Sequence, residues 1–181
     1  STGGSIVAGS STVTFSGNSS SVNGSVASQT FNNLTVNKTA GQTLSIGGSV
    51  ATLTLNASLT LTSGVLDAGT ATAMNVGGNW TNNGSSFTAG SGTVTFNGSG
   101  AQSVGGSSST TFNNLTISGS TVTLTNDAPV VGNLLISTGT MDLATFAANR
   151  TASGGSLIVS SGTTLKLAGS SGGVAGSNFP N

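Results

Sequence analysis

The residues that could carry chemistry are few and widely spaced. The charged side chains are those of Lys38, Asp67, Asp127, Asp142, Arg150 and Lys166. Two of the carboxylates follow similar sequences, Asp67 after G-V-L and Asp142 after G-T-M. Two carboxylates that hydrolyse a glycosidic bond must lie about 5–10 Å apart. Whether Asp67 and Asp142 can act together therefore depends on the fold that positions them.

The closest grouping of charges is formed by Asp142, Arg150 and Lys166. These are the residues that a polysaccharide-degrading enzyme built on this chain would have to use. The simpler expectation is that they are solvated or salt-bridged surface groups. For Asp67 and Asp142 we expect a carboxylate that hydrogen-bonds the backbone of its own turn, and a calcium contact is the less favoured alternative.

The residues that are missing exclude several classes of site. The sequence has no His, Cys, Tyr or Glu, so the usual zinc ligands and a disulfide framework are absent, and no His can activate a serine. The three basic residues are too few to form a nucleic-acid-binding stripe. No apolar run approaches the roughly 20 residues that span a bilayer. The sequence therefore predicts no catalytic, cofactor-binding or metal-binding residues, and a protein that is not an enzyme.

The chain contains a long internal repeat. Ala8–Phe15 (A-G-S-S-T-V-T-F) returns as Ala89–Phe96, and Thr30–Val36 (T-F-N-N-L-T-V) returns as Thr111–Ile117, with the same offset along the chain in both cases. Farther along, L-T-S-G-V-L-D at 61–67 matches I-S-T-G-T-M-D at 136–142. The predicted organisation is one domain, 1–181, with a first repeat at about 8–88, a second at about 89–167 and a partial third at 168–181.

A shorter beat of about 20 residues runs through each repeat. Pairs of apolar residues separated by one polar residue return at this spacing: Val13/Phe15, Leu34/Val36, Leu53/Leu55, Met74/Val76, Val94/Phe96 and Leu115/Ile117. Alternation of this kind, with Thr between the apolar residues and Gly or Asn turns between the pairs, is typical of short strands with one buried face. No window has helical periodicity, so we expect an all-β chain.

The constant beat favours a right-handed parallel β-helix, or β-solenoid, of about 20 residues per coil over an antiparallel sandwich or propeller. The ten residues expected to point inward are Val13, Phe15, Leu34, Val36, Leu53, Leu55, Val94, Phe96, Leu115 and Ile117. The paired Asn after Phe31 and Phe112 are expected at corners, with left-handed backbone and side chains that form ladders between coils. In such a fold Asp67 and Asp142 are nearly four coils apart and cannot act together.

The motifs T-F-N-N-L-T, G-G-N-W-T-N-N-G and A-G-S-G-T-V-T-F-N-G resemble the tandem repeats of large secreted bacterial surface proteins. These are adhesin-like, filamentous-haemagglutinin-like or autotransporter-like chains. The resemblance covers nearly the whole chain. It implies a β-helical surface fibre or adhesin stalk, and no catalytic residue is carried over with it.

Three further surface features suggest alternatives. Ten N-x-S/T sequons permit glycosylation. Repeated Thr-x-Thr pairs permit an ice-binding face, although the segment 154–159 breaks their series. Trp80 permits a carbohydrate-stacking platform, but Trp80 and the Phe residues are expected mostly in the core. A carbohydrate-binding module thus stays an alternative function.

The favoured function is a stiff extracellular fibre or stalk at the cell surface. Gly, Ser, Thr and Asn make up 108 of the 181 residues, so uncharged polar groups must solubilise the surface. The segments 1–9 and 168–181 do not resemble the polar caps of other solenoids. The expected partners are therefore copies of the chain itself, in a tandem array or stacked head to tail, with glycans or cell surfaces as further candidates.

Overall fold

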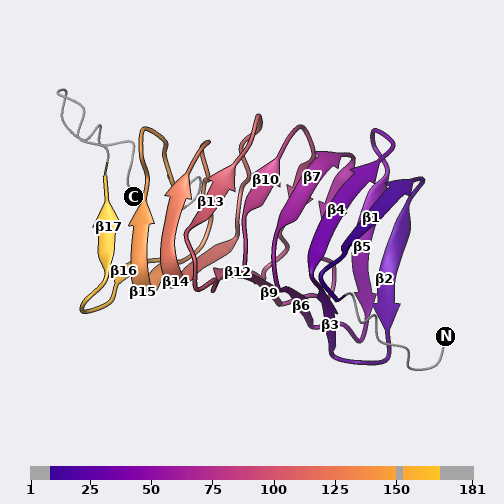
Figure 1. Cartoon of the computed structure of the whole chain (residues 1–181), viewed down its shortest axis with the longest axis horizontal. Helices are drawn as coiled ribbons and strands as arrows, with labels where there is room; N and C mark the ends of the chain where they lie inside the picture. The colour runs from indigo at the N-terminus through magenta and orange to yellow at the C-terminus, as the bar shows by residue number, and fades with distance from the viewer. Residues whose placement is uncertain (1–8, 150–152, 168–181) are drawn as a thin grey trace.

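The computed structural model describes residues 9–149 and 153–167, and these residues form seventeen β-strands and no helix. The strands pair in parallel and stack as a β-solenoid of about seven turns with a spacing of about 21 residues. Figure 1 shows the result as a row of coils along one axis. The predicted parallel solenoid is therefore confirmed. The sandwich alternative is wrong, because no antiparallel hairpin joins consecutive strands in the described ranges.

Each turn of the solenoid has three faces, which we call walls A, B and C in the order in which the chain follows them. Wall A is an unbroken parallel ladder in which Leu53 pairs with Met74 and Met74 with Val94. Its strands are β3 (Ser28–Phe31), β6 (Thr52–Leu55), β9 (Ala73–Val76), β12 (Thr93–Phe96), the first part of β14 (Asn114–Leu124), the first part of β15 (Leu134–Asp142) and β16 (Leu157–Val159).

Wall B is the second ladder. It consists of β1 (Thr12–Gly17), β4 (Asn33–Lys38), β7 (Leu59–Ser63), β10 (Trp80–Asn82), β13 (Gln102–Gly105), the second parts of β14 and β15, and β17 (Thr164–Lys166). Because β14 and β15 run through the corner between the walls, walls A and B form one sheet of thirteen strands.

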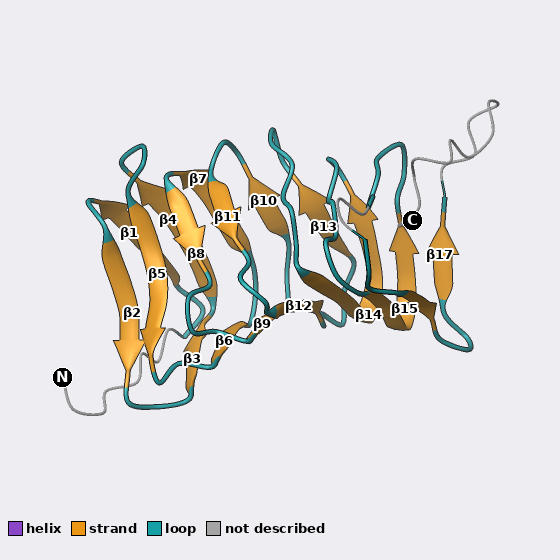
Figure 2. Cartoon of the chain, turned by 180° about the vertical axis from the view of Figure 1, so that it is seen from behind, coloured by secondary structure: helices purple, strands orange, loops and turns teal. Residues whose placement is uncertain are grey.

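Wall C is shorter and is seen best from behind (Figure 2). Its four strands are β2 (Ser20–Gly24), β5 (Thr43–Gly48), β8 (Val65–Asp67) and β11 (Ser86–Thr88). Beyond β11 the regular ladder stops. The wall resumes in the next coil, where Phe112 forms a parallel bridge with Val130.

The core lies inside the three walls and is made of the inward halves of the alternating strands. Eight of the ten predicted inward residues are buried, and Val13 and Phe15 are half-buried because they belong to the first described coil. Each fully buried apolar side chain contributes about 1.5–3 kcal/mol relative to an exposed one. The threonines between them, such as Thr54 and Thr95, lie on the outside and are partly exposed.

The beat predicted from the sequence is correct for most of the strands and wrong at one step. Leu34 does not stack with Leu53, because Leu34 pairs with Leu59 on wall B and Leu53 pairs with Gln29 on wall A. The interval from Leu34 to Leu53 therefore crosses from one wall to another. The full turn at this level is longer and runs from Leu34 to Leu59.

The long repeat does not contain a whole number of turns. Val13 lies on wall B, whereas its repeat equivalent Val94 lies on wall A. Phe31 lies on wall A, whereas its equivalent Phe112 lies on wall C. The second repeat is thus shifted back by one wall relative to the first, because four full turns on wall B lead from Val13 to Val104, which lies beyond Val94, the repeat equivalent of Val13.

Asparagine side chains connect the coils at the corners, as predicted. The Asn33 Oδ1 atom accepts a hydrogen bond from the Ser58 N–H at 3.0 Å, and Asn114 Oδ1 accepts one from the Asn133 N–H at 2.9 Å. The predicted left-handed backbone is wrong, since Ala144 is the only described residue other than Gly with a positive φ. These asparagines satisfy backbone donors without a special backbone conformation.

Candidate functional site

Asp67 and Asp142 lie on different walls, and each accepts a hydrogen bond from the backbone of its own turn. Asp67 is in β8 on wall C, and its Oδ1 accepts a hydrogen bond from the Gly69 N–H at 3.0 Å. Asp142 is at the end of β15 on wall B, and its Oδ1 accepts one from the Ala144 N–H at 2.9 Å. The expectation that each carboxylate binds the backbone of its own turn is confirmed. The structure does not bring the two carboxylates together.

Asp142 also forms an ion pair with Lys166, with 2.7 Å between Lys166 Nζ and Asp142 Oδ2. The hydrogen bond from Lys166, with a further one from the Ala144 N–H, lowers the pKa of the Asp142 carboxyl group. The Lys166 side chain is 64% exposed, so solvent screens the pair. Arg150, the third residue of the predicted grouping, lies outside the described residues. The salt bridge is the arrangement expected of a surface group.

Lys38 is a buried lysine that the sequence reasoning missed. Its Nζ donates to the carbonyl oxygens of Ser16 at 3.0 Å and Asn18 at 2.7 Å, and to Ser20 Oγ at 2.7 Å. Only 3% of Lys38 is exposed, and its Nζ lies 5.9 Å from the ring centroid of Phe15. These three acceptors match the three donors of an ammonium group. Lys38 therefore fastens the turn between β1 and β2 to β4.

An aromatic cluster fills the middle of the solenoid. Trp80 is fully buried, which confirms its predicted place in the core. Its ring centroid lies 4.9 Å from that of Phe87, 6.4 Å from that of Phe96 and 5.1 Å from that of Phe112, all in edge-to-face geometry. Pairs of this kind contribute about 0.5–1.5 kcal/mol beyond the area that they bury. Trp80 is therefore not available as an exposed stacking platform.

A buried polar network borders this cluster. The Trp80 Nε1–H donates to Thr110 Oγ1 at 3.1 Å, and Asn82 Nδ2 donates to the same oxygen at 3.1 Å and to the Ser109 carbonyl at 3.0 Å. Asn82 Oδ1 accepts from the Ser85 N–H at 3.0 Å. Since a buried polar group without a partner is costly, these bonds fix the position of the segment 108–110.

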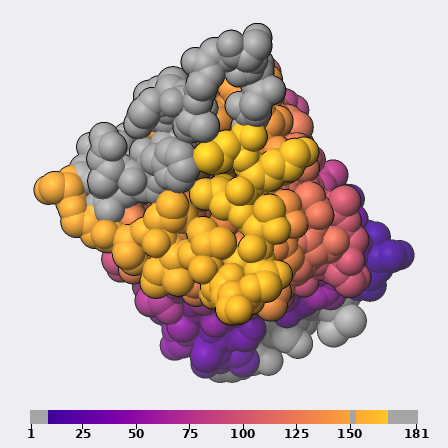
Figure 3. All heavy atoms as spheres, turned by 90° about the vertical axis from the view of Figure 1, so that its left-hand side faces the viewer, coloured from indigo at the N-terminus to yellow at the C-terminus, as the bar shows by residue number. Residues whose placement is uncertain are grey.

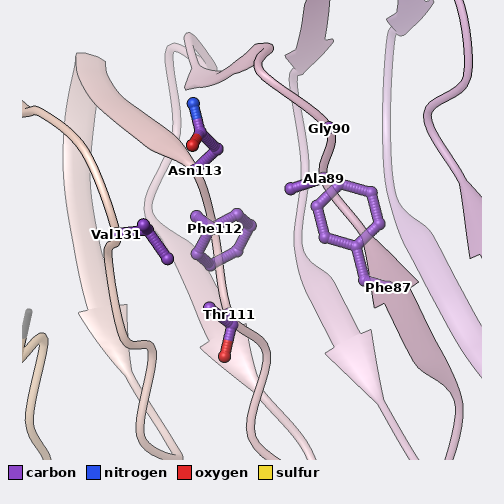
Figure 4. A pocket seen from close by; sticks show the side chains of 7 residues that line it. All are labelled: Phe87, Ala89, Gly90, Thr111, Phe112, Asn113 and Val131. Carbon is purple, nitrogen blue, oxygen red and sulfur yellow. The ribbon is translucent and has the colours of Figure 1, made fainter. Parts of the chain in front are cut away.

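The interrupted part of wall C holds a pocket of about 290 Å³. It lies between the end of β11 and the segment 111–113, and Figure 4 shows the rings of Phe87 and Phe112 at its sides. Ala89, Gly90 and Val131 complete its apolar lining, and Thr111 and Asn113 are its polar residues. We call this pocket, between β11 and segment 111–113, the wall C slot. No local signal in the sequence predicts it, because it arises from strand pairs that fail to form.

The other surface features are distributed over several walls. The Thr-x-Thr pairs 52/54 and 93/95 lie on wall A, whereas 12/14, 60/62 and 121/123 lie on wall B. Of the ten sequon asparagines, the exposed ones are Asn18, Asn23, Asn37, Asn56, Asn79, Asn83 and Asn97. These seven are the sites that are open to glycosylation, which stays an alternative.

The first and last described coils have strand edges that pair on one side only. Among the described residues, β1 pairs only with β4, and β16 and β17 pair only with β15. At the C-terminal end, Ile158 is 49% and Val159 is 43% exposed. Figure 3 views the molecule from this end, with the described atoms of the last coil in yellow. Strand edges of this kind are templates for pairing with another chain.

Comparison with known proteins gives no match: no family model, no curated protein and no solved structure is significantly similar to the chain. Within residues 9–149 and 153–167, no three potential metal ligands of the His, Cys, Asp or Glu type lie together. The same residues contain no helix long and apolar enough to cross a membrane.

Proposed function

We propose that the chain is a structural module of a stiff extracellular fibre or stalk at the cell surface, assembled from tandem or head-to-tail copies. The observation that carries this proposal is that, among the described residues, β1 at one end and β16 and β17 at the other pair on one side only. The near absence of charge and the lack of Cys in a surface rich in Ser, Thr and Asn support an extracellular location.

The described strands at the two ends of wall B, β1 and β17, each pair with one neighbour and run in the same direction. A second copy that continues the stack places its β1 beside β17 on wall B, in the same strand direction. The half-buried Val13 and Phe15 of one copy then cover the partly exposed apolar residues of the other, as they would within the rod. Such a contact is heterologous and propagates as a filament.

The same proposal gives the chain no catalytic role. Asp67 and Asp142 lie on separate walls, and each already binds its own turn. The opposing hypothesis is a polysaccharide-degrading enzyme that uses Asp142, Arg150 and Lys166. Release of reducing ends or unsaturated products from a glycan panel, lost in Asp142→Ala, would support that hypothesis and contradict ours.

Sedimentation velocity and electron microscopy at rising protein concentration test the assembly. We expect rods that lengthen with concentration and that persist in high salt, because few charges are involved. Val159→Lys places a charge in the end-to-end contact and should keep the protein monomeric. Thr116→Lys, on the outer surface of wall A in the middle of the rod, is the matched control and should still assemble. A well-folded native protein that stays monomeric at all concentrations would refute the assembly.

A further inference from the structure

One edge of the wall C slot is the strand β11, which has backbone groups without a partner among the described residues. In β11, the Ser86 N–H donates to the Gly64 carbonyl at 3.0 Å, and the Thr88 carbonyl accepts from the Ala68 N–H at 2.9 Å. In a parallel ladder, alternate residues direct their N–H and C=O groups to opposite neighbours. The N–H and C=O of Phe87, between these two residues, therefore point away from β8 and toward the slot.

The other edge of the slot is the segment 110–112, and its backbone groups without a partner point back toward β11. The Thr110 N–H donates to the Asp127 carbonyl at 3.3 Å, and the Phe112 N–H donates to the Pro129 carbonyl at 2.8 Å. The N–H and C=O of Thr111 therefore point away from the segment 127–130 and toward β11. No hydrogen bond between described residues joins the Phe87 or Thr111 backbone to a partner across the slot.

The buried hydrogen-bond network at Asn82 holds the two edges of the slot apart. The Ser108 N–H donates to the Asn82 carbonyl at 3.0 Å, and the Asn82 side chain binds Ser109 and Thr110. The segment 108–110 is thus bonded to the end of β10 rather than to β11. Thr110 and Asn82 are 3% and 1% exposed, so this anchoring is a rigid part of the core. The fold itself therefore holds this gap in wall C open.

We propose that the wall C slot binds an extended, uncharged peptide segment of a partner protein as an added strand. Both edges of the slot offer unpaired backbone donors and acceptors, and strand addition uses such groups for recognition. The half-buried Phe87 ring contacts one apolar side chain of the added segment, and the fully buried Phe112 ring, with its centroid 6.1 Å away, supports Phe87 from the core. None of the described residues that line the slot is charged, which favours an uncharged segment.

The size and lining of the slot argue for a peptide over a sugar. Its volume of about 290 Å³ lies just below the range of about 300–1,000 Å³ for small-molecule pockets. A sugar needs several converging polar side chains, and among the described residues the slot offers those of Thr111 and Asn113 alone. A peptide obtains its hydrogen bonds from the backbone of Phe87 and Thr111 instead.

Trp80 provides the readout, because it is the only tryptophan of the chain and contacts both rings of the slot. The experiment titrates the whole chain with the capped peptide acetyl-Ser-Thr-Leu-Thr-Ser-amide and records Trp80 emission. Amide hydrogen exchange is followed by NMR in the same samples. We expect a saturable change in emission, and exchange at the Phe87 and Thr111 amides that is fast in the free protein and slowed by the peptide.

Two variants make the test specific. Ala89→Leu fills the slot and should weaken peptide binding at least about tenfold. Thr88→Leu adds the same side chain at the neighbouring, exposed position and should leave the affinity within about twofold. Slow exchange at both amides in the free protein would show a closed wall and overturn the proposal. So would a peptide that causes no saturable change, or a maltotriose titration that produces the change in its place.

Discussion

The close approach of successive coils at Gly69 can be tested with one added methyl group. Gly69 follows β8 and has a φ of +52°, and a Cβ added there would overlap the backbone oxygen of Ile46 in the preceding coil. That oxygen is held in place by the Thr70 N–H at 3.0 Å. Gly69→Ala therefore forces apart two bonded coils as well as placing alanine in a left-handed conformation.

Gly41→Ala separates these two costs. Gly41 has a φ of +76°, but a Cβ added there meets no atom within 4 Å. The left-handed conformation costs an L-residue about 1–2 kcal/mol, and the loss of freedom in the unfolded chain returns about 0.4–1 kcal/mol. Gly41→Ala should thus cost up to about 1.5 kcal/mol. Gly69→Ala adds about 1–3 kcal/mol of steric strain.

Urea denaturation followed by far-UV circular dichroism gives the free energy of unfolding of both variants. Emission from Trp80 in the same samples shows whether the middle coils unfold together with the rest. We expect Gly69→Ala to be clearly less stable than Gly41→Ala, with the slope of the transition unchanged. Equal losses in the two variants would mean that the coils separate at Gly69 without cost, and our account of the coil contact would be refuted.

Three further changes test other contacts. Lys38→Met removes a donor to three oxygens and should cost about 1–3 kcal/mol, with faster amide exchange confined to β1 and β2; a loss spread over the whole chain would contradict this. Thr110→Val leaves the Trp80 indole N–H without an acceptor and should cost about 2–3 kcal/mol in urea denaturation, whereas Thr110→Ser should be nearly neutral. The pKa of Asp142 is lowered in the folded protein, so its carboxylate should stabilise the fold above pH about 4, and this contribution should be lost as the pH falls below that value. Thermal melts of Asp142→Asn should show a weaker dependence of stability on pH in this acid range, by less than about 1 kcal/mol because Lys166 is exposed. An unchanged acid profile would contradict the ion pair.

Local alternation in the sequence was sufficient to predict the strands and most of the core. Leu53, Leu55, Val94 and Phe96 are buried as expected, because a strand between two coils must bury alternate residues. The same alternation extends from Leu34 through Val36 to Lys38, so it contained the signal that Lys38 points inward. That signal was missed because a lysine is expected at the surface.

The assignment of strands to walls could not be obtained in this way. All three walls use the same alternation, so the spacing from Leu34 to Leu53 looks like one turn although it joins two walls. The position of each strand depends on the lengths of the corners, which vary without a clear pattern in a chain rich in Gly and Ser. The wall C slot depends on a missing ladder between Phe87 and Thr111, and only the complete path of the chain reveals it.

The shift of the second repeat by one wall has a consequence for any array of such units. If repeats of this length follow one another with the same offset, each copy of a surface motif is turned by one wall from the copy before it. The motif then winds around the rod like a screw thread and returns to the same side only after three units. A thread of this kind would present the same groups to all sides of the fibre, so that a partner could approach from any direction. The unit of sequence duplication and the unit of the coil are thus independent lengths, and their mismatch sets the pitch of the thread.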